Sequence, residues 1–209
     1  MNYSFRYAKP NDVKAVIKLF YHAFKPKFLT MLPNEPQEGL LLYFNYFYKG
    51  LNKKKDKLII CLDNTETIVG FLLIEGFGIP FFSLNPSPSI VKSYVRKFGI
   101  KKFFRLFLGM LLIEGYPPST NYLYINTIIV KKEYRGQKIG KKFLKIAEYI
   151  AITRNMIGIC LYVDSRNEIA MNMYKKQNFI IDGGFGGKFL EKNIGVKYYY
   201  YQYKKFTKK

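Results

Sequence analysis

Residues 122–164 constrain the fold of this 209-residue chain more than any other stretch. They begin with YLYINTIIV (Tyr122–Val130), pass through a basic turn into QKIGKKFLKIAEYIAIT (residues 137–153), and end with GICLYVD (Gly158–Asp164). The outer segments have the length and β-branched content of buried strands, whereas the middle segment repeats its apolar residues at helical spacing. The stretch therefore predicts a strand, a turn, a helix and a second strand, as in α/β proteins.

The residues before this stretch predict a strand, two helices and a hairpin. These elements are expected at residues 3–8, 12–24, 40–51, 58–62 and 68–75. Asn11 is suited to cap the first helix, because an asparagine side chain accepts a hydrogen bond from a free backbone amide. The two hairpin strands are joined by a short turn around Asp63 and Asn64.

The residues after the stretch predict a short helix at 167–177, a strand at 179–182 and a long final strand at 195–206. Residues 77–120 are irregular and then helical, which is typical of an insertion. Part of the insertion predicts a basic amphipathic helix, either lying on a membrane or an acidic partner, or packing over the sheet and walling a binding site. Its apolar residues are Phe103, Phe104, Phe107, Leu108 and Leu111, and its basic residues are Lys97, Lys101, Lys102 and Arg105.

The order of elements predicts one mixed α/β (α+β) domain over residues 1–209, with a central twisted mixed sheet flanked by helices. The chain is 49% hydrophobic, which indicates a globular protein with a full core. It contains no low-complexity linker and no internal repeat.

Charge limits the choice of partners. Lys and Arg number 35 against 14 Asp and Glu, for a formal net charge of +21. This favours nucleic acid, an acidic membrane or a phosphorylated cofactor as a partner. The alternative is a compositional bias without a partner, because the lysines are spread along the whole chain.

Two further expectations concern location and metals. The N-terminal residues lack the apolar region of a signal peptide, and the apolar run LFLGMLLI is too short to span a bilayer, so we expect a cytoplasmic protein. Cys61 and Cys160 lie in apolar runs and are expected to be buried thiols. With His22 as the single histidine, we expect no metal site.

The turn after Tyr122–Val130 has the composition of a phosphate site. A helix N-terminus offers unpaired backbone amides and the positive end of the helix dipole. Gly136 and Gly140 have no Cβ to obstruct a ligand, while Arg135, Lys138 and Lys141 add positive charge. The turn predicts a pyrophosphate cradle; the alternative is a plain helix start with solvated lysines.

The segment IIVKKEYRGQKIGKKFL resembles motif A of the GCN5-related N-acetyltransferases, whose signature is Gln or Arg, two residues, Gly, one residue, then Gly or Ala. Arg135 opens this signature and Gly140 closes it. Lys138 stands where the family has its middle glycine, which changes how closely a pyrophosphate approaches the backbone and leaves the amide donors in place.

NEIAMNMYKKQNFIIDG is similar to motif B of the same family. The matching residues are Asn167, Ala170, Tyr174 and Phe179. Asn178 replaces the usual glycine, and asparagine tolerates the left-handed conformation that glycine adopts there.

The resemblance implies that acetyl-coenzyme A is the cosubstrate and that an amine attacks it directly in a ternary complex. It implies that the strand ending at Val130 splays from its neighbour and frees the amides of Ile128, Ile129 and Val130 for the pantetheine arm. The pyrophosphate would be bound by Arg135, Gly136, Gln137, Lys138, Ile139, Gly140 and Lys141. Tyr174 would give its proton to the departing thiolate, and Asn167 would contact the pantetheine or cap a helix.

The sequence leaves the general base, the acceptor and the oligomeric state open. The base is unassigned among Glu75, Glu114, Asn126 and an ordered water. The acceptor is unidentified, although the positive charge mildly favours neutral or acidic amines, peptides or an N-terminus over polyamines. A homodimer is left open. The rival function is a catalytically weak protein of the same fold that binds nucleic acid or an acidic membrane.

Overall fold

The computed structural model describes residues 2–31, 58–75, 88–104, 108 and 121–206, which build a seven-stranded sheet in the order β1-β2-β3-β4-β5-β7-β6. The strands are β1 (Ser4–Tyr7), β2 (Leu58–Leu62), β3 (Ile68–Glu75), β4 (Tyr122–Val130), β5 (Gly158–Asp164), β6 (Ile180–Gly186) and β7 (Tyr198–Lys205). β4 and β5 are parallel, and the other neighbouring strands are antiparallel. The mixed sheet predicted from the sequence is therefore confirmed.

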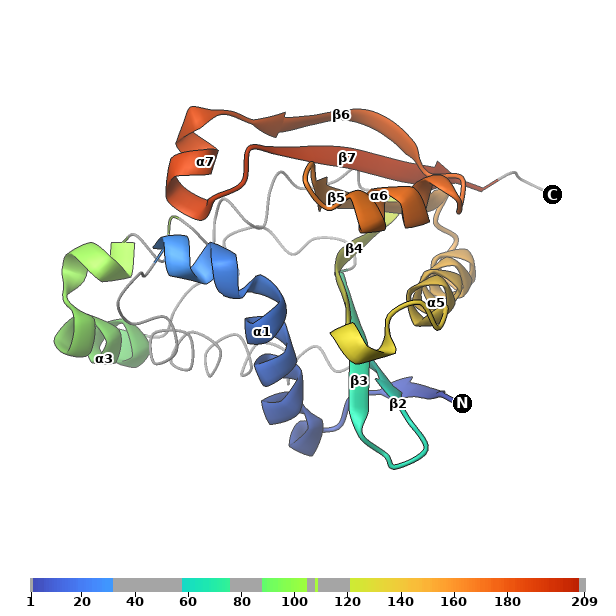
Figure 1. Ribbon diagram of the computed structural model, residues 1–209, viewed down its shortest axis with the longest axis horizontal. Helices are drawn as coiled ribbons and strands as arrows, with labels where there is room; N and C mark the ends of the chain where they lie inside the picture. Colours follow the sequence, from blue (N-terminus) through green and yellow to red (C-terminus); the bar gives the residue numbers. More distant parts are fainter. Residues whose placement is uncertain (1, 32–57, 76–87, 105–107, 109–120, 207–209) are drawn as a thin grey trace.

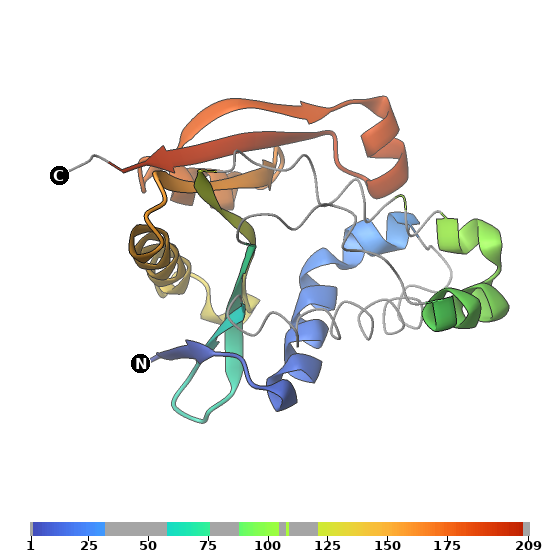
Figure 2. The same ribbon diagram turned by 180° about the vertical axis from the view of Figure 1, so that it is seen from behind.

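Helices cover both faces of this sheet, as the two opposite views in Figures 1 and 2 show. They are α1 (Val13–Met31), α3 (Pro88–Phe98), α5 (Ile139–Thr153), α6 (Glu168–Lys175) and α7 (Lys188–Ile194). α1, α3 and α7 contribute to one buried cluster, whereas α5 and α6 contribute to the other. We call these two sides of the sheet the α1 face and the α5 face.

Apolar burial stabilises the two faces. Phe28, Phe71 and Ile194 are fully or almost fully buried on the α1 face, as are Phe143 and Leu144 on the α5 face. Each such side chain contributes roughly 1.5–3 kcal/mol when it is removed from water. The sheet is thus a rigid support for loops at its strand ends.

The sheet opens between its two parallel strands. β4 pairs with β5 only from Tyr122 to Ile125, opposite Gly158 to Leu161. Immediately beyond, the register with β3 shifts and leaves Asn126 as an extra residue, a β-bulge. Figure 1 shows β1–β4 and β5–β7 diverging from this point. We call the opening the β4–β5 gap.

Some expected boundaries were wrong. The first helix is longer than residues 12–24 and continues to Met31 through Pro26. Asn11 is not its cap; a 3-10 turn (Pro10–Asp12) precedes the helix, and the Asp12 carboxylate accepts a 2.6 Å hydrogen bond from the Lys9 amide. An ion pair with Arg6 at 2.7 Å holds this carboxylate in position. Asp12, and not Asn11, therefore accepts the hydrogen bond at the turn.

The region after residue 178 differs most from the prediction. The expected strand at 179–182 extends to Gly186, because Gly184 allows close backbone approach; a Cβ there would lie 2.0 Å from the Tyr199 carbonyl oxygen. The expected strand at 195–206 begins only at Tyr198, after helix α7. α7 was missed because its apolar pattern is short, with only Leu190 and Ile194 buried.

The insertion is described in part. α3 ends before Gly99, whose φ of +85° interrupts the expected continuous helix. Tyr94, Phe98 and Phe103 pack with the α1-face cluster, whereas Phe104 is exposed. Phe107, Leu111, Glu114 and the expected helix at 40–51 lie outside the described residues. Among the described helices, none has the length and hydrophobicity needed to span a bilayer.

Candidate active site

The free edge of β4 in the β4–β5 gap presents backbone donors. The amide of Lys131, directly after β4, donates to the carbonyl oxygen of Val69 at 2.8 Å, so the β4 residues that bond β3 next to it are Ile129 and Thr127. The backbone groups of Ile128 and Val130 therefore point toward β5. Since β5 pairing stops at Ile125, their amides have no partner among the described residues.

This alternation corrects one expectation. The amide of Ile129 belongs to the ladder with β3, opposite Phe71, and is not free in the gap. The expected splaying of the two strands is confirmed, with Ile128 and Val130 as its free amides. The sequence could not separate these residues, because a hydrogen-bonding register depends on the neighbouring strand.

The turn between β4 and α5 presents a second group of donors. α5 begins at Ile139, and its first intrahelical bond runs from the Lys142 amide to the Lys138 carbonyl at 3.1 Å. Within the described residues, no backbone carbonyl accepts from the amides of residues 136–141. These are Gly136, Gln137, Lys138, Ile139, Gly140 and Lys141. Free amides at a helix N-terminus favour a bound phosphate.

Two residues of this turn have left-handed backbones. Gly136 has φ of +80°, and an added Cβ there would meet no atom within 4 Å, so its glycine serves the backbone conformation. Lys138, the N-cap of α5, has φ of +62° and ψ of +11°. A lysine thus adopts a left-handed conformation that glycine adopts more easily, at a cost of about 1 kcal/mol or more.

Three side-chain contacts hold the turn in place. A 3-10 turn (Lys132–Tyr134) follows β4, and the Tyr134 hydroxyl donates to the Asp63 carboxylate of the β2–β3 turn at 2.7 Å. The Tyr3 hydroxyl donates to the Gln137 side-chain oxygen. Arg135 Nε donates to the Val130 carbonyl at 3.2 Å. The hairpin and the N-terminal segment therefore position both ends of the turn.

Gly140 offers one of the free amides, and it also affects how two helices pack. A Cβ on Gly140 would lie 2.8 Å from the sulfur of Met173 on α6. The absent side chain therefore lets α6 approach the first turn of α5. This contact brings the helix that carries Tyr174 against the donor-rich turn.

Tyr174 is buried at 7% exposure on the α5 face, and its ring packs 5.3 Å from that of Phe179. Burial raises the pKa of Tyr174, so its hydroxyl is protonated near neutral pH. The hydroxyl forms no hydrogen bond with the residues that the structure describes. It is a proton donor without an acceptor in the described part of the chain.

The other motif B residues have local structural roles. Asn167 caps α6, because its side-chain oxygen accepts from the Ala170 amide at 3.2 Å. Asn178 has φ of +64°, which confirms the left-handed conformation expected there. Of the two alternatives for Asn167, the helix cap is present; a contact with pantetheine stays a prediction.

The structure describes two of the three residues considered as the general base. Asn126 forms the β4 bulge beside the gap, and its side-chain oxygen accepts from the Thr127 hydroxyl at 2.7 Å. Glu75 ends β3, on the strand next to β4. Glu114 lies outside the described residues.

The described residues also bear on thiol chemistry and on metal binding. Cys61 and Cys160 are free and buried, as expected, and burial raises their pKa values to about 11 and about 12. Neither is therefore an activated nucleophile near neutral pH. Across the described ranges, no three His, Cys, Asp or Glu residues gather in a way that would hold a metal ion.

Comparison with protein families matches residues 17–179 to the acetyltransferase (GNAT) family. A curated relative, thialysine N-epsilon-acetyltransferase of Bos taurus, is 40% identical over 53 residues. These residues are 25% of this chain and 31% of that protein, so the chain matches about a third of the relative's length.

Solved structures share the fold. One described as an acetyltransferase has a TM-score of 0.63 and 17% identity, covering 98% of this chain and 100% of the other. PaiA N-acetyltransferase from Thermoplasma acidophilum, solved with coenzyme A, has a TM-score of 0.59 and 16% identity, covering 99% of this chain and 100% of that one. At these identities the likeness concerns the fold.

Proposed function

This chain belongs to the acetyltransferase (GNAT) family, and on that premise we propose that it transfers the acetyl group of acetyl-coenzyme A to a primary amine. One observation carries the proposal: the free amides of Ile128 and Val130 in the β4–β5 gap lie on the strand that leads directly into the donor-rich turn. The two groups of donors suit the amide-containing arm and the pyrophosphate of one extended ligand.

The fit to this cosubstrate rests on donors and charge. The amides of residues 136–141 suit phosphate oxygens, and the exposed side chains of Lys138, Lys141 and Lys142 add positive charge around them. Arg135 is also exposed and bonds the end of β4, which connects the turn with the gap. These residues are the proposed cofactor site, with Ile128 and Val130 for the arm.

We assign proton donation to Tyr174. Acyl transfer from a thioester ends with a thiolate, which leaves more readily when a positioned acid protonates it. The Tyr174 hydroxyl is protonated, has no described acceptor, and lies on α6 beside the turn. Because its raised pKa makes it a weak acid, its contribution depends on its position next to the sulfur.

The acetyl group passes to the amine by direct attack of the amine on the thioester in a ternary complex, without an acyl-enzyme. Formation of an acyl-enzyme would need an activated nucleophile, and the buried thiols of Cys61 and Cys160 are protonated near neutral pH. The attacking amine must be neutral, so a proton leaves before or during attack. We assign uptake of this proton to an ordered water at the bulge of Asn126. β4 itself contains no carboxylate that could act as the base.

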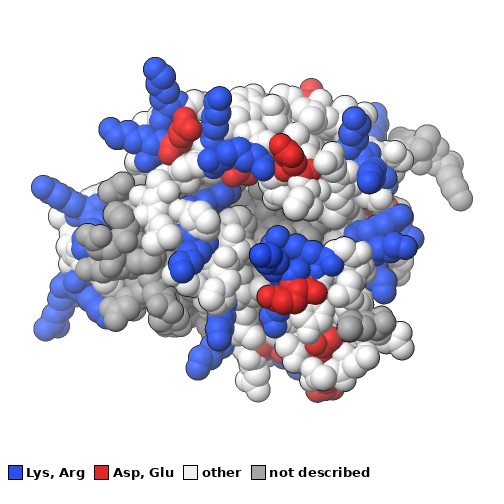
Figure 3. All heavy atoms as spheres, viewed as in Figure 1, with Lys and Arg blue, Asp and Glu red and all other residues white. Residues whose placement is uncertain are grey.

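The rival function of nucleic-acid or membrane binding has weaker support. On the face in Figure 3, lysine and arginine side chains are scattered over several elements and interrupted by acidic ones. A docking surface for a polyanion would concentrate them. A cytoplasmic location and a single domain over residues 1–209 stay predictions from the sequence, and a homodimer stays open.

Thermal unfolding with two ligands separates the functions. We expect acetyl-coenzyme A to raise the midpoint of unfolding, because it binds the folded state only, and duplex DNA at physiological salt to leave it unchanged. Stabilisation by DNA alone would reverse the assignment. Free-thiol release with a panel of amines then identifies acceptors.

A further inference from the structure

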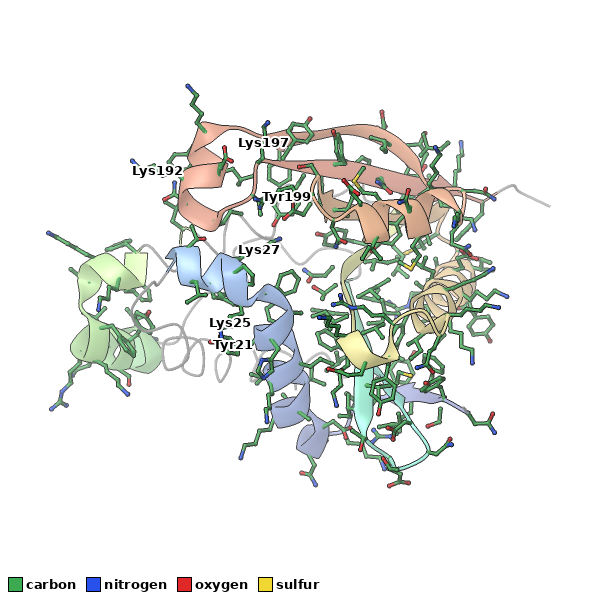
Figure 4. All side chains as sticks on the ribbon, in the orientation of Figure 1. Tyr21, Lys25, Lys27, Lys192, Lys197 and Tyr199 are labelled. Atoms are coloured by element: carbon green, nitrogen blue, oxygen red, sulfur yellow. The ribbon has the colours of Figure 1, made fainter. Side chains whose placement is uncertain are left out.

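A lysine, a carboxylate and a tyrosine meet on the α1 face at the free end of β5. Asp164 is the last residue of β5 and lies beyond Leu161, where pairing with β4 stops. Tyr199 of β7 is its partner across the ladder, and Lys27 of α1 contacts both. Figure 4 labels Lys27 and Tyr199 where α1 approaches β7. The cluster borders the β4–β5 gap on the face opposite α5.

This position faces the route of the acceptor. The donor-rich turn and Tyr174 lie on the α5 face, so the proposed cosubstrate enters the gap from that side. An amine must then reach the thioester from the α1 face. Lys27, Asp164 and Tyr199 are polar groups of that face at the end of the strand that lines the gap.

The cluster has more hydrogen-bond donors than acceptors. The Lys27 ammonium donates to the Tyr199 hydroxyl at 2.8 Å and lies 3.5 Å from Asp164 Oδ2. An ammonium has three N–H groups and a tyrosine has one O–H. At least one N–H of Lys27 and the O–H of Tyr199 therefore have no acceptor among the described residues. Both donors belong to largely buried side chains, where unpaired donors are costly.

Positive charge is also in excess among the described residues of the cluster. Asp164 is shared between Lys27 at 3.5 Å and Arg166 at 3.6 Å, and both distances exceed those of tight ion pairs, about 2.7–2.9 Å. Burial lowers the pKa of Lys27, opposed by Asp164, as expected for an ammonium that is incompletely compensated. Among the residues that the structure describes, one carboxylate thus faces two cations.

Aromatic rings enclose the ammonium. Lys27 Nζ lies 5.1 Å from the centre of the Phe24 ring and 4.9 Å from that of Tyr199. The Phe185 ring lies 5.3 Å from the Tyr199 ring. The surroundings therefore combine unused donors, net positive charge and apolar walls.

We propose that Lys27 and Tyr199 form a subsite for a carboxylate of the acetyl acceptor, so that the preferred acceptors are amines that carry a carboxylate, such as amino acids. The carboxylate accepts the unused donors and balances the second cation. The amine at the other end of the same molecule is directed into the gap. This inference rests on the proposed acetyl transfer and names its acceptor class.

Matched ligands test the subsite by binding alone. We would titrate the protein, saturated with coenzyme A to prevent turnover, with L-lysine against cadaverine and with L-phenylalanine against phenethylamine. Each pair differs only in the carboxylate. We expect the carboxylate member to bind the wild type at least about tenfold more tightly, as for a hydrogen bond to a charged group.

Variants of α1 provide the controls. Lys27→Gln should abolish the preference, and Lys27→Arg should retain it because the cation is kept. Lys25→Gln should also retain it; Lys25 is exposed and lies two positions away, on the other side of the helix. If Lys27→Gln does not fold, Tyr199→Phe decides, since it removes one donor and keeps the ring, and should weaken the preference.

Equal binding of both members of each pair by the wild type, including no binding of either, overturns the proposal. So does a preference that survives Lys27→Gln or, where that variant does not fold, one that Tyr199→Phe leaves unchanged. Neither result affects the cosubstrate site, because acetyl-coenzyme A binding is measured in a separate titration. Failure of that titration would instead remove the proposed function.

Discussion

The hydroxyl of Tyr134 donates a 2.7 Å hydrogen bond to the carboxylate of Asp63, joining the turn before α5 to the turn of the β2–β3 hairpin. The two residues are 71 positions apart in the sequence. Asp63 also accepts bonds from the Thr65 hydroxyl and from the amides of Thr65 and Thr67, so it is fixed within its own turn. It therefore acts as a rigid anchor for the donor-rich segment.

Replacing Tyr134 by phenylalanine should weaken acetyl-coenzyme A binding by about threefold to tenfold, because the turn loses its anchor while Asp63 keeps its local bonds. Calorimetric titration measures the dissociation constant. Tyr149→Phe is the matched control, since Tyr149 is 70% exposed on α5. Identical dissociation constants for the two variants would show that the contact does not position the site.

The same carboxylate should make stability depend on acid pH. Hydrogen bonds from the Thr65 hydroxyl and then from the Tyr134 hydroxyl lower the pKa of Asp63 from 3.8 to about 2. A depressed folded-state pKa means that the ionised carboxylate stabilises the fold above pH about 4, and that this contribution is lost as the pH falls toward 2. Urea unfolding from pH 5 to pH 2 should therefore bring wild type and Asp63→Asn closer together. A constant difference across that range would contradict the assignment.

Lys138 should carry backbone strain. Its φ of +62° is favourable for glycine and costly for other residues, so Lys138→Gly should be more stable than Lys138→Ala by about 1 kcal/mol. Both variants remove the ammonium, so their difference reports the backbone alone. Denaturant unfolding gives the two free energies. An alanine variant as stable as the glycine variant would exclude a left-handed residue at this position.

Tyr174→Phe should lower kcat by about 10²- to 10⁴-fold while leaving acetyl-coenzyme A affinity unchanged, because only the proton donor is removed. Steady-state kinetics at saturating cosubstrate, with an acceptor from the amine panel, gives kcat. The Tyr149→Phe variant again serves as the control. A Tyr174→Phe variant with full turnover would exclude this residue as the general acid.

Spacing along the chain was sufficient to predict the elements that carry the site. The strands β2, β3, β4 and β5 were predicted at their observed bounds, because their apolar runs end at clear turn residues. The left-handed conformation of Asn178 was predicted from the replacement of the usual glycine of motif B by asparagine. These features depend on neighbouring residues, which a sequence displays directly.

Contacts between segments that are far apart in the sequence were not predicted, because neighbouring residues do not indicate them. Lys27 and Tyr199 are 172 positions apart, and nothing at either position indicates that they meet. The separate roles of Ile128 and Ile129 depend on the register with β3, which periodicity does not define. α7 was missed because two buried residues in a short segment give too weak a helical pattern.

Residue-resolved amide hydrogen exchange of β4, measured by nuclear magnetic resonance with and without acetyl-coenzyme A, tests the central claim most directly. The amides of Ile128 and Val130 face the β4–β5 gap without a described partner, whereas that of Ile129 belongs to the β3 ladder. We predict that acetyl-coenzyme A slows exchange at Ile128 and Val130 and leaves the already protected Ile129 unchanged. Unchanged exchange at Ile128 and Val130 under saturating ligand would contradict binding in the gap.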